Sequence, residues 1–472
     1  MWLRGLMSDP YDIAVIGAGP AGGNAALTAA RSGLRVVMLD EQPATGGQVW
    51  RGKSASIVSA PATPEGTAGD ALRSALGDST VTQHSNTRVW DIRRETGLWH
   101  LQILQDNTST EITARALILA TGAREYVQPV PGWTTPGVIG LAGATALFKQ
   151  SLSLPGQRTV VSGTGPLVFY VASEIRRLGG EVAAIVTPNT RTDWARAVPA
   201  MLSQPKLLAR GAVWMADLML ARVPILWGHA VSGVSGTDGV TGVMTRDLSS
   251  GSAGPEFAAD SLCLGHGLIP QIEAAQMLGV PIRHDPNLGG WVPDAAPDGA
   301  TPVKGLYLCG DGCGIRGVAA AGLQGTLTGA RVTRDLGKAA PEPSLRPWQR
   351  AARFGQAMTA LSLPRPEVQA LTTLDTIVCR CESLCHADIT AEVATGAASA
   401  NAVKSGLRAG MGPCGGKYCQ TAIAALIAAQ TGKTISDVPP PTPRPPLRPL
   451  PLGQAAGDFD YDDLPIPKPA PL

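Results

Sequence analysis

The sequence predicts an α/β protein with two Rossmann-like dinucleotide-binding domains, followed by a small helical domain that carries cysteines. Three observations predict this architecture. Two strand–helix–strand patterns have glycine-rich turns, two other apolar strands end in small-residue turns, and several cysteines gather after residue 372. The 472 residues are enough for about two to four domains with their own cores. Because 44% of the residues are apolar and 16% are charged, a mainly disordered chain is excluded.

The charge balance and the apolar pattern exclude further classes of protein. The 39 Lys and Arg against 37 Asp and Glu leave a net charge of +2, which gives no strong electrostatic case for nucleic-acid binding. No apolar run is long enough for a membrane-spanning helix. The first seven residues are too short and too weakly apolar for a signal peptide, and Met1 and Met7 are both candidate starts. Eight cysteines without an export signal favour a reducing compartment, so we expect a cytoplasmic protein.

The first strand–helix–strand unit carries a dinucleotide-binding pattern. A buried strand at 12–16 runs into the G-x-G-x-x-G turn at 17–22, and an Ala-rich helix and a second strand at 34–39 follow. These glycines permit a tight turn and let the backbone and the helix N-terminus approach a pyrophosphate. A carboxylate at the end of the second strand is placed to bind the ribose hydroxyls. Asp40 fits the spacing better than Glu41.

Two distant strands favour a flavin at this site. The strand at 116–123 ends in a small-residue turn, and the strand at 305–311 ends in Gly-Asp. In this order the three motifs resemble the FAD/NAD(P)-dependent pyridine-nucleotide-disulfide oxidoreductase superfamily, over roughly residues 10–335. No C-x-x-C pair occurs, so disulfide-reducing chemistry is not expected. The FAD residues that the resemblance implies are Gly17, Gly19, Pro20, Ala21, Gly22, Asp40, Glu41, Gly46, Gly47, Gln48, Ala120, Thr121, Gly122, Gly310 and Asp311.

A second strand–helix–strand unit between these segments has a weaker nucleotide-binding signal. The strand at 159–162 leads into Gly163 and Gly165, but Val168 stands where the third glycine belongs. The next strand ends at Asn189 without a carboxylate for the ribose. The fold is therefore predicted better than the ligand. NAD(P), ATP and an empty scaffold all stay open for this domain.

Four cysteines in the C-terminal part have the spacing of an iron–sulfur or zinc site. They are arranged as C-x-C, 32 residues, C-x₄-C. We favour a 2Fe–2S cluster over a structural zinc ion, because the C-x-C pair is tight for a zinc finger and the segment follows a flavoprotein. Cys385 and His386 are close enough in sequence to be alternative ligands, although we expect them to be bystanders. The predicted ligands are Cys379, Cys381, Cys414 and Cys419.

This last segment resembles the BFD-like (bacterioferritin-associated-ferredoxin-like) 2Fe–2S domain. Together with the motifs at 46–51, 120–125, 265–270, 379–382 and 408–414, it makes nearly the whole chain resemble the large subunits of heteromeric FAD-dependent amino-acid and opine dehydrogenases. The expected organisation is an FAD-binding domain at 8–130 and 259–335, an NAD(P)-binding-like domain at 131–258, a linker with one short helix at 336–372, the 2Fe–2S domain at 373–436 and a Pro-rich tail at 437–472. The tail is either a loose terminus or an arm laid on a partner protein.

The resemblance implies an electron-transfer role. In such complexes a D-amino-acid-oxidase-like beta subunit with its own FAD oxidises a C–N bond, and interfacial FMN and a small ferredoxin-like subunit occur in some members. We expect an opine, an imino acid or a small amino acid as substrate, with an opine as first choice. No catalytic residue is assigned, because the six histidines form no cluster in the sequence. The alternatives are a stand-alone NAD(P)H-dependent FAD/2Fe–2S reductase and a redox-sensing scaffold.

Overall fold

The largest sheet combines parallel and antiparallel strands. The computed structural model describes residues 9–57, 59–363 and 365–456, so the two candidate starts and the tail after 456 lie outside the described residues. The sheet has seven strands in the order β3-β2-β1-β6-β5-β4, and β19 also pairs with β6. β1, β2, β3 and β19 pair in parallel, whereas β4, β5 and β6 form an antiparallel meander. The strands are β1 (Tyr11–Ile16), β2 (Val36–Leu39), β3 (Thr82–His84), β4 (Arg88–Glu95), β5 (Leu98–Gln105), β6 (Thr108–Leu119) and β19 (Leu306–Leu308).

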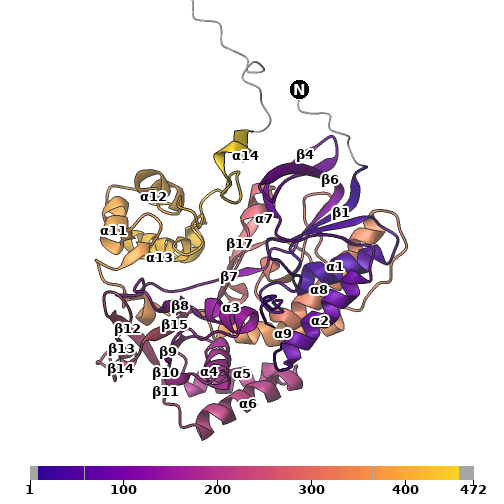
Figure 1. Cartoon of the computed structure of the whole chain (residues 1–472). Helices are drawn as coiled ribbons and strands as arrows, with labels where there is room; N and C mark the ends of the chain where they lie inside the picture. The colour runs from indigo at the N-terminus through magenta and orange to yellow at the C-terminus, as the bar shows by residue number, and fades with distance from the viewer. Residues whose placement is uncertain (1–8, 58, 364, 457–472) are drawn as a thin grey trace, which may run out of the picture.

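Three helices cover one face of this sheet: α1 (Pro20–Ala30), α2 (Pro64–Gly77) and α8 (Gly317–Asp335). α1 and α8 pack closely side by side (Figure 1). The close approach depends on small residues, because a Cβ at Gly329 would lie 2.5 Å from the Ala25 carbonyl oxygen. The opposite face is covered by the β4–β5 hairpin and by α7 (Glu273–Met277). The dinucleotide-binding fold predicted from the first glycine motif is confirmed.

The second sheet is entirely parallel, in the order β11-β10-β9-β15-β8. A small antiparallel sheet, β12-β13-β14, flanks it, and β7–β16 and β17–β18 form two further antiparallel pairs. The strands are β7 (Ala123–Glu125), β8 (Val138–Gly140), β9 (Arg158–Gly163), β10 (Glu181–Thr187), β11 (Ile225–Trp227), β12 (His229–Ser235), β13 (Gly242–Asp247), β14 (Phe257–Ala258), β15 (Ser261–Gly265), β16 (Leu268–Pro270), β17 (Ile282–Asp285) and β18 (Gly290–Pro293). The helices are α3 (Leu141–Ser151), α4 (Leu167–Arg177), α5 (Arg191–Met201) and α6 (Pro205–Leu220).

The segment 336–372 differs from the expected linker. It forms α9 (Arg346–Ala360), of 15 residues, and the short α10 (Pro366–Gln369). α9 buries Ala351, Ala352 and Gly355 against α8 and its N-terminal turn. The prolines of this segment suggested a linker, but Pro347 is the second residue of α9 and Pro366 the first of α10. The N–H groups of a first helical turn have no partner within the helix, so proline interrupts no helical hydrogen bond there.

The small C-terminal domain contains the β20–β21 hairpin and three helices around an apolar core that includes Val378, Ile389, Val403 and Ile427. The chain then crosses back to the first sheet, where the described part of it ends in a short helix (Figure 1). Among the described residues, no helix has the length and apolar character that crossing a bilayer requires. The elements are β20 (Ile377–Cys379), β21 (Leu384–Cys385), α11 (His386–Ala394), α12 (Ala400–Leu407), α13 (Gln420–Thr431) and α14 (Leu452–Ala456).

Candidate flavin and iron–sulfur site

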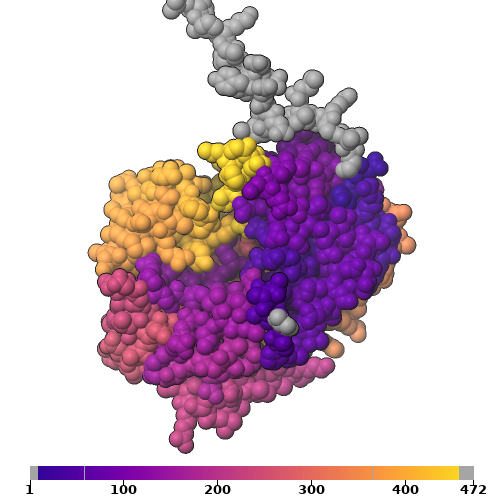
Figure 2. Space-filling view, viewed as in Figure 1, coloured from indigo at the N-terminus to yellow at the C-terminus, as the bar shows by residue number. Residues whose placement is uncertain are grey.

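A cavity of about 500 Å³ lies at the carboxyl ends of β1, β2, β6 and β19. This is the edge at which parallel sheets bind their ligands. Figure 2 shows the surface hollowed between the small C-terminal domain, in orange, and the indigo-to-purple N-terminal part. Most of the predicted FAD residues line this cavity. They are Gly17, Gly19, Pro20, Ala21, Asp40, Glu41, Gly47, Gln48, Ala120, Thr121, Gly122, Gly310 and Asp311.

The two remaining predicted residues, Gly22 and Gly46, lie behind the cavity wall. A Cβ at Gly22 would collide with the Gly17 carbonyl oxygen, and one at Gly46 would collide with the Trp50 carbonyl oxygen. Gly46 N–H also donates to the Ala18 carbonyl oxygen over 2.8 Å. Both glycines therefore shape the turn without lining the cavity.

Asp40 follows β2, and its carboxylate lies against the glycine turn that follows β1. Its Oδ2 accepts from Ala18 N–H at 2.5 Å and its Oδ1 accepts from Gln42 N–H at 2.7 Å. Burial raises the pKa of this carboxyl above its usual range, and the two backbone donors oppose that effect. Each oxygen keeps a further lone pair, so Asp40 can still accept from ribose hydroxyls.

Asp311 lies at the opposite end of the sheet edge, where β19 gives way to α8. Its Oδ1 accepts from Arg316 N–H and Gly317 N–H, both at 2.9 Å. The carboxyl is buried, and burial raises its pKa. The bonds that Oδ1 makes are those of a helix cap, and Oδ2 makes none with the described residues. Asp311 can therefore cap α8 and bind a hydroxyl group in the cavity at the same time.

Glu41 forms an ion pair with the C-terminal tail. Arg448 Nε lies 2.6 Å from Glu41 Oε1, and Leu447 N–H donates to the Trp90 carbonyl oxygen over 2.7 Å. Leu447 and Arg448 both line the cavity near Asp40. The part of the Pro-rich tail that the structure describes thus crosses the chain's own first domain, at the edge of the cavity.

Glu125 places a buried carboxyl in the same cavity. Its Oε1 accepts from Ala142 N–H at 2.9 Å, at the start of α3. Burial raises its pKa to about 8, although the backbone donors of Ala142 and Leu141 act in the opposite direction. The carboxyl is therefore largely protonated at neutral pH.

This raised pKa predicts a pH dependence of stability. A group whose pKa is higher in the folded state than in the unfolded state loses its stabilising contribution as pH rises from about 4.5 to about 8. At pH 5 we expect Glu125→Gln to have the melting temperature of wild type, and at pH 8 a higher one, with both proteins free of flavin. Thermal unfolding at the two pH values measures the difference in melting temperature between variant and wild type. An equal difference at both pH values would mean that Glu125 is ionised in the folded protein.

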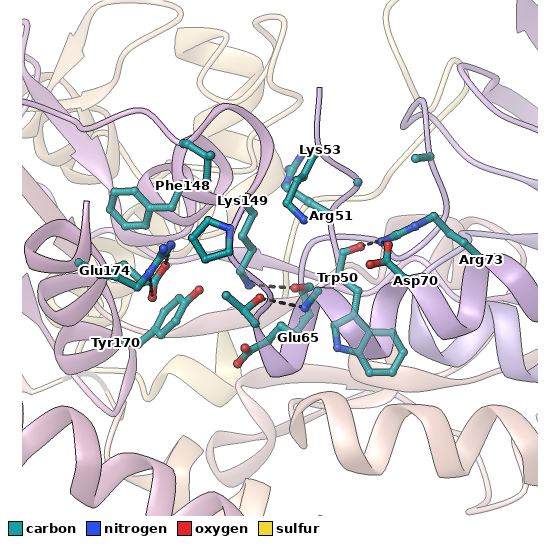
Figure 3. A pocket seen from close by; sticks show the side chains of 18 residues that line it. Trp50, Arg51, Lys53, Glu65, Asp70, Arg73, Phe148, Lys149, Tyr170 and Glu174 are labelled. Atoms are coloured by element: carbon teal, nitrogen blue, oxygen red, sulfur yellow. Dashed lines mark hydrogen bonds and ion pairs between the residues drawn. The ribbon is translucent and has the colours of Figure 1, made fainter. Parts of the chain in front are cut away.

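A second cavity of about 270 Å³ lies on the other side of the loop 47–52 (Figure 3). Lys149 projects from α3 and donates to the Val49 carbonyl oxygen over 2.9 Å, with Nζ 5.3 Å from the centre of the Tyr170 ring. Burial lowers the pKa of Lys149 to about 8. Arg51 and Lys53 are further cations in this wall, and no carboxylate of the described residues lies within 4.0 Å of any of the three. This cavity is therefore cationic.

The four predicted cluster ligands come together in the small domain as two pairs. The Cys419 thiol lies beside Cys379, and the Cys381 thiol lies beside Cys414. The neighbouring Cys419 thiol, together with the backbone N–H groups of Gly410, Glu382 and Cys381, lowers the pKa of Cys379 to about 5 against the effect of burial. Among the described residues no three donor side chains are close enough to hold one metal ion. Two thiol pairs suit a cluster of two irons better than one zinc ion.

Cys385 has a structural role. It is the N-cap of α11, where its side chain accepts from Asp388 N–H and the Asp388 carboxylate accepts from Cys385 N–H at 2.8 Å. His386 is the first residue of the same helix. This contact within α11 favours the prediction that Cys385 is not a ligand of the cluster.

The loop between Cys414 and Cys419 forms part of the wall of the first cavity, at the carboxyl ends of β1, β2, β6 and β19, which we call the flavin cavity. Lys417 and Tyr418 both line that cavity. Arg380, between the first two cysteines, lies with its guanidinium carbon 4.5 Å from the centre of the Tyr418 ring and 4.8 Å from that of Trp133 in the body of the protein. Trp133 in turn donates to the Ile377 carbonyl oxygen over 2.6 Å. These contacts attach the cysteine domain directly beside the cavity.

The second nucleotide motif is covered by the chain itself. A Cβ at Gly165 would lie 2.5 Å from Ser362 Oγ, and Asn189 Nδ2 donates to the Leu361 carbonyl oxygen over 2.7 Å. Asn189 Oδ1 accepts from Gly165 N–H at 3.0 Å. Gly163 is also closed in, because a Cβ there would collide with the Gly265 carbonyl oxygen. The turn after α9 therefore lies where a Rossmann domain would hold a pyrophosphate.

Comparison with known proteins defines the class. Residues 11–326 match the family described as pyridine nucleotide-disulphide oxidoreductase, and residues 377–429 match the BFD-like 2Fe-2S binding domain. The molecule is thus an oxidoreductase that binds FAD and a 2Fe–2S cluster. The fold resembles that of L-proline dehydrogenase from P. horikoshii, with a TM-score of 0.71 and 20% identity over 94% of this chain and 79% of that one.

The relatives narrow the class to one group. The A subunit of opine oxidase from Rhizobium meliloti (strain 1021) is 32% identical over 461 residues, which cover 94% of this chain and 98% of that protein. Hydrogen cyanide synthase subunit HcnB of Pseudomonas protegens is 28% identical over 93% of this chain and 96% of that protein. The chain belongs to the pyridine nucleotide-disulphide oxidoreductase family, within the group that contains this opine oxidase component. The predicted resemblance is confirmed.

Several residues of the site were not predicted. Arg124 and Glu125 lay inside a quoted motif, but nothing in the sequence showed that they line the cavity. Lys417 and Tyr418 were visible only as residues between two cysteines, and Arg448 as one arginine in a Pro-rich tail. Each comes to the cavity through contacts between distant segments, which spacing alone does not encode.

Proposed function

We propose that this chain is the electron-transfer subunit of a heteromeric dehydrogenase. A D-amino-acid-oxidase-like partner with its own FAD oxidises the C–N bond of an opine, an imino acid or a small amino acid. Electrons then pass through the FAD and 2Fe–2S cluster of this chain to an acceptor. Further components are FMN at the interface with the partner and a small ferredoxin-like subunit. An opine is the favoured substrate, because a protein named as an opine oxidase subunit is similar over nearly the whole chain.

The observation that carries this proposal is the position of the cysteine domain. Lys417 and Tyr418, from the loop that bears the last two cysteines, belong to the wall of the flavin cavity. FAD takes up an electron pair and releases electrons singly, and a 2Fe–2S cluster carries one electron. A chain that holds both groups beside one wall is suited to pass electrons between them.

The residues of this cavity support FAD as its ligand. The N-terminus of α1, beside Gly17 and Gly19, would hold the pyrophosphate. Asp40 would accept from the ribose, and Asp311 from the ribitol. The four thiols Cys379, Cys381, Cys414 and Cys419 would hold the cluster.

The ionisable groups of the cavity support a chain that does not oxidise the substrate itself. Asp40, Asp311 and Glu125 accept from backbone N–H groups. Glu273 pairs with Arg124 at 2.5 Å, so this carboxylate is neutralised as well. Asp40 and Asp311 are assigned to the hydroxyl groups of FAD, and burial raises the pKa of Glu125 to about 8, so none of the three is a free carboxylate base at neutral pH. This favours a separate partner protein, on which the substrate reacts.

The alternative, a stand-alone NAD(P)H-dependent reductase, is disfavoured by the segment around Leu361 and Ser362 that covers the second glycine motif. The same contacts argue against ATP in that domain. The ion pair between Arg365 and Asp193, at 2.7 Å, attaches the following residues to α5 and adds to the covering.

This arrangement predicts that nicotinamides do not reduce the protein. In an anaerobic titration, NADH and NADPH should leave the flavin and cluster absorbance unchanged. Addition of an opine together with the partner protein should bleach both. Bleaching by NADPH or NADH alone would establish the stand-alone reductase and overturn the proposal of an electron-transfer subunit.

A further inference from the structure

A third cavity, of about 350 Å³, lies between the cysteine domain and the flavin-binding body. Arg124 and Leu268 belong to its wall and also to the wall of the flavin cavity, so the two cavities share a partition. On its other side the cavity meets α13, which begins directly after Cys419. Any molecule held there is adjacent both to the flavin cavity and to the helix that follows the cluster loop.

The wall of this cavity is mainly apolar. Its apolar side chains come from β16, the N-cap of α7, the turn after α9, α13 and the segment that follows α13. Such a wall favours an uncharged ligand with an apolar ring or chain. The residues that give this character are Leu268, Ile272, Leu363, Ala424, Ile435 and Val438.

Polar side chains interrupt the apolar wall in several places, and two of them offer N–H donors without a partner among the described residues. Trp291 Nε1 is buried and has no hydrogen-bond partner in the part of the chain that the structure describes. His266 Nδ1 accepts from Gln128 N–H at 3.1 Å, so the neutral ring carries its proton on Nε2. Nε2 makes no hydrogen bond with the described residues either. Because a buried donor without a partner costs free energy, a ligand with carbonyl oxygens would be favoured here.

The charges of the cavity exclude a phosphate-bearing ligand. Among the described residues, Arg124 is the one Lys or Arg in its wall, and Glu273 neutralises it at 2.5 Å. His266 and His284 both have pKa values lowered by burial, so neither supplies a charge near neutral pH. The cationic cavity beside Lys149 would suit a phosphate far better.

We propose that this cavity binds a quinone, which is the electron acceptor of the complex. The inference rests on the proposed function, because the electrons come from the reduced centres of this chain. The quinone takes up two electrons, and its two carbonyl oxygens take up two protons from water and become hydroxyls. Trp291 and His266 donate hydrogen bonds to the quinone oxygens, and the apolar wall holds the ring.

The test measures binding of a short-chain ubiquinone to the oxidised protein loaded with FAD and cluster. Titration calorimetry detects this binding without any electron transfer. Ala424→Phe fills the cavity from α13 and should abolish binding. Trp291→Phe keeps an aromatic ring but removes the N–H, and should weaken binding about fivefold to tenfold. Trp348→Phe is the matched control, because its Nε1 is also buried without a partner among the described residues but lies outside this cavity.

The control variant should bind as wild type does. Equal binding to wild type and to Ala424→Phe, or no binding to wild type, would overturn the proposal. A second flavin released from this cavity by Ala424→Phe would overturn it in favour of FMN. Failure of the proposed function would instead appear as a cluster that stays oxidised beside a reduced flavin, which is measured separately.

Discussion

Replacement of Cys379 by serine is expected to remove the cluster from the protein while FAD stays bound. Cys379 is buried, and its sulfur is surrounded by the Cys419 thiol and backbone N–H groups. These donors favour a thiolate, whereas a serine hydroxyl stays protonated at neutral pH and is a poor ligand for iron. Because changes even in groups that only support metal ligands cost about tenfold to hundredfold in affinity, loss of a ligand should weaken cluster binding at least that much and leave the purified protein depleted of iron.

Iron and sulfide analysis together with the flavin absorbance measures both effects in one sample. Cys385→Ser is the matched control. It changes a nearby cysteine whose side chain caps α11, and serine is itself a good N-cap. The control should keep its iron. Retention of iron in Cys379→Ser, or equal loss in both variants, would show that the cluster is not held as assigned.

Replacement of Gly19 by valine is expected to weaken FAD binding without unfolding the protein. Gly19 has a φ of −72°, which any residue can adopt, and the nearest atom to an added Cβ is Gly47 Cα at 3.8 Å. The backbone therefore tolerates the side chain, which occupies the cavity where α1 begins. A steric cost of about 3 kcal/mol corresponds to a dissociation constant raised on the order of a hundredfold.

Flavin fluorescence on reconstitution of the apoprotein measures the constant. The matched control is Gly77→Ala, at the end of α2, where an added Cβ meets no atom within 4 Å. We expect the control to bind FAD as wild type does and both variants to melt within a few degrees of wild type. Unchanged FAD affinity in Gly19→Val would mean that the pyrophosphate does not approach this turn.

Local patterns predicted the elements that bind ligands along one continuous stretch. The turn at Gly17 and the strand ending at Asp40 are encoded by residues close in sequence, so periodicity and glycine spacing sufficed. The cluster ligands Cys379 and Cys381 could also be predicted, because the other two ligands follow in the same small domain. Even the choice between Asp40 and Glu41 gains support from the structure, because Glu41 turns to Arg448.

Contacts between distant segments could not be predicted. The prolines after residue 336 indicated a linker, yet the segment folds into α9 and its end covers Gly165. The Pro-rich tail showed no preference between a loose end and an arm, because its contacts are with Trp90 and Glu41, which lie near the other end of the sequence. These contacts between distant segments depend on the complementary shapes of two folded domains, and they cannot be predicted from the composition of either segment.

The central claim is that electrons pass between flavin and cluster within one chain. Anaerobic flash photoreduction of the flavin, followed by the absorbance and low-temperature electron paramagnetic resonance of the cluster, tests it directly. The account predicts that cluster reduction follows flavin reduction with a first-order rate constant that does not change with protein concentration, and that the phase is absent from Cys379→Ser. A rate proportional to protein concentration, or a reduced flavin beside a cluster that stays oxidised, would contradict it.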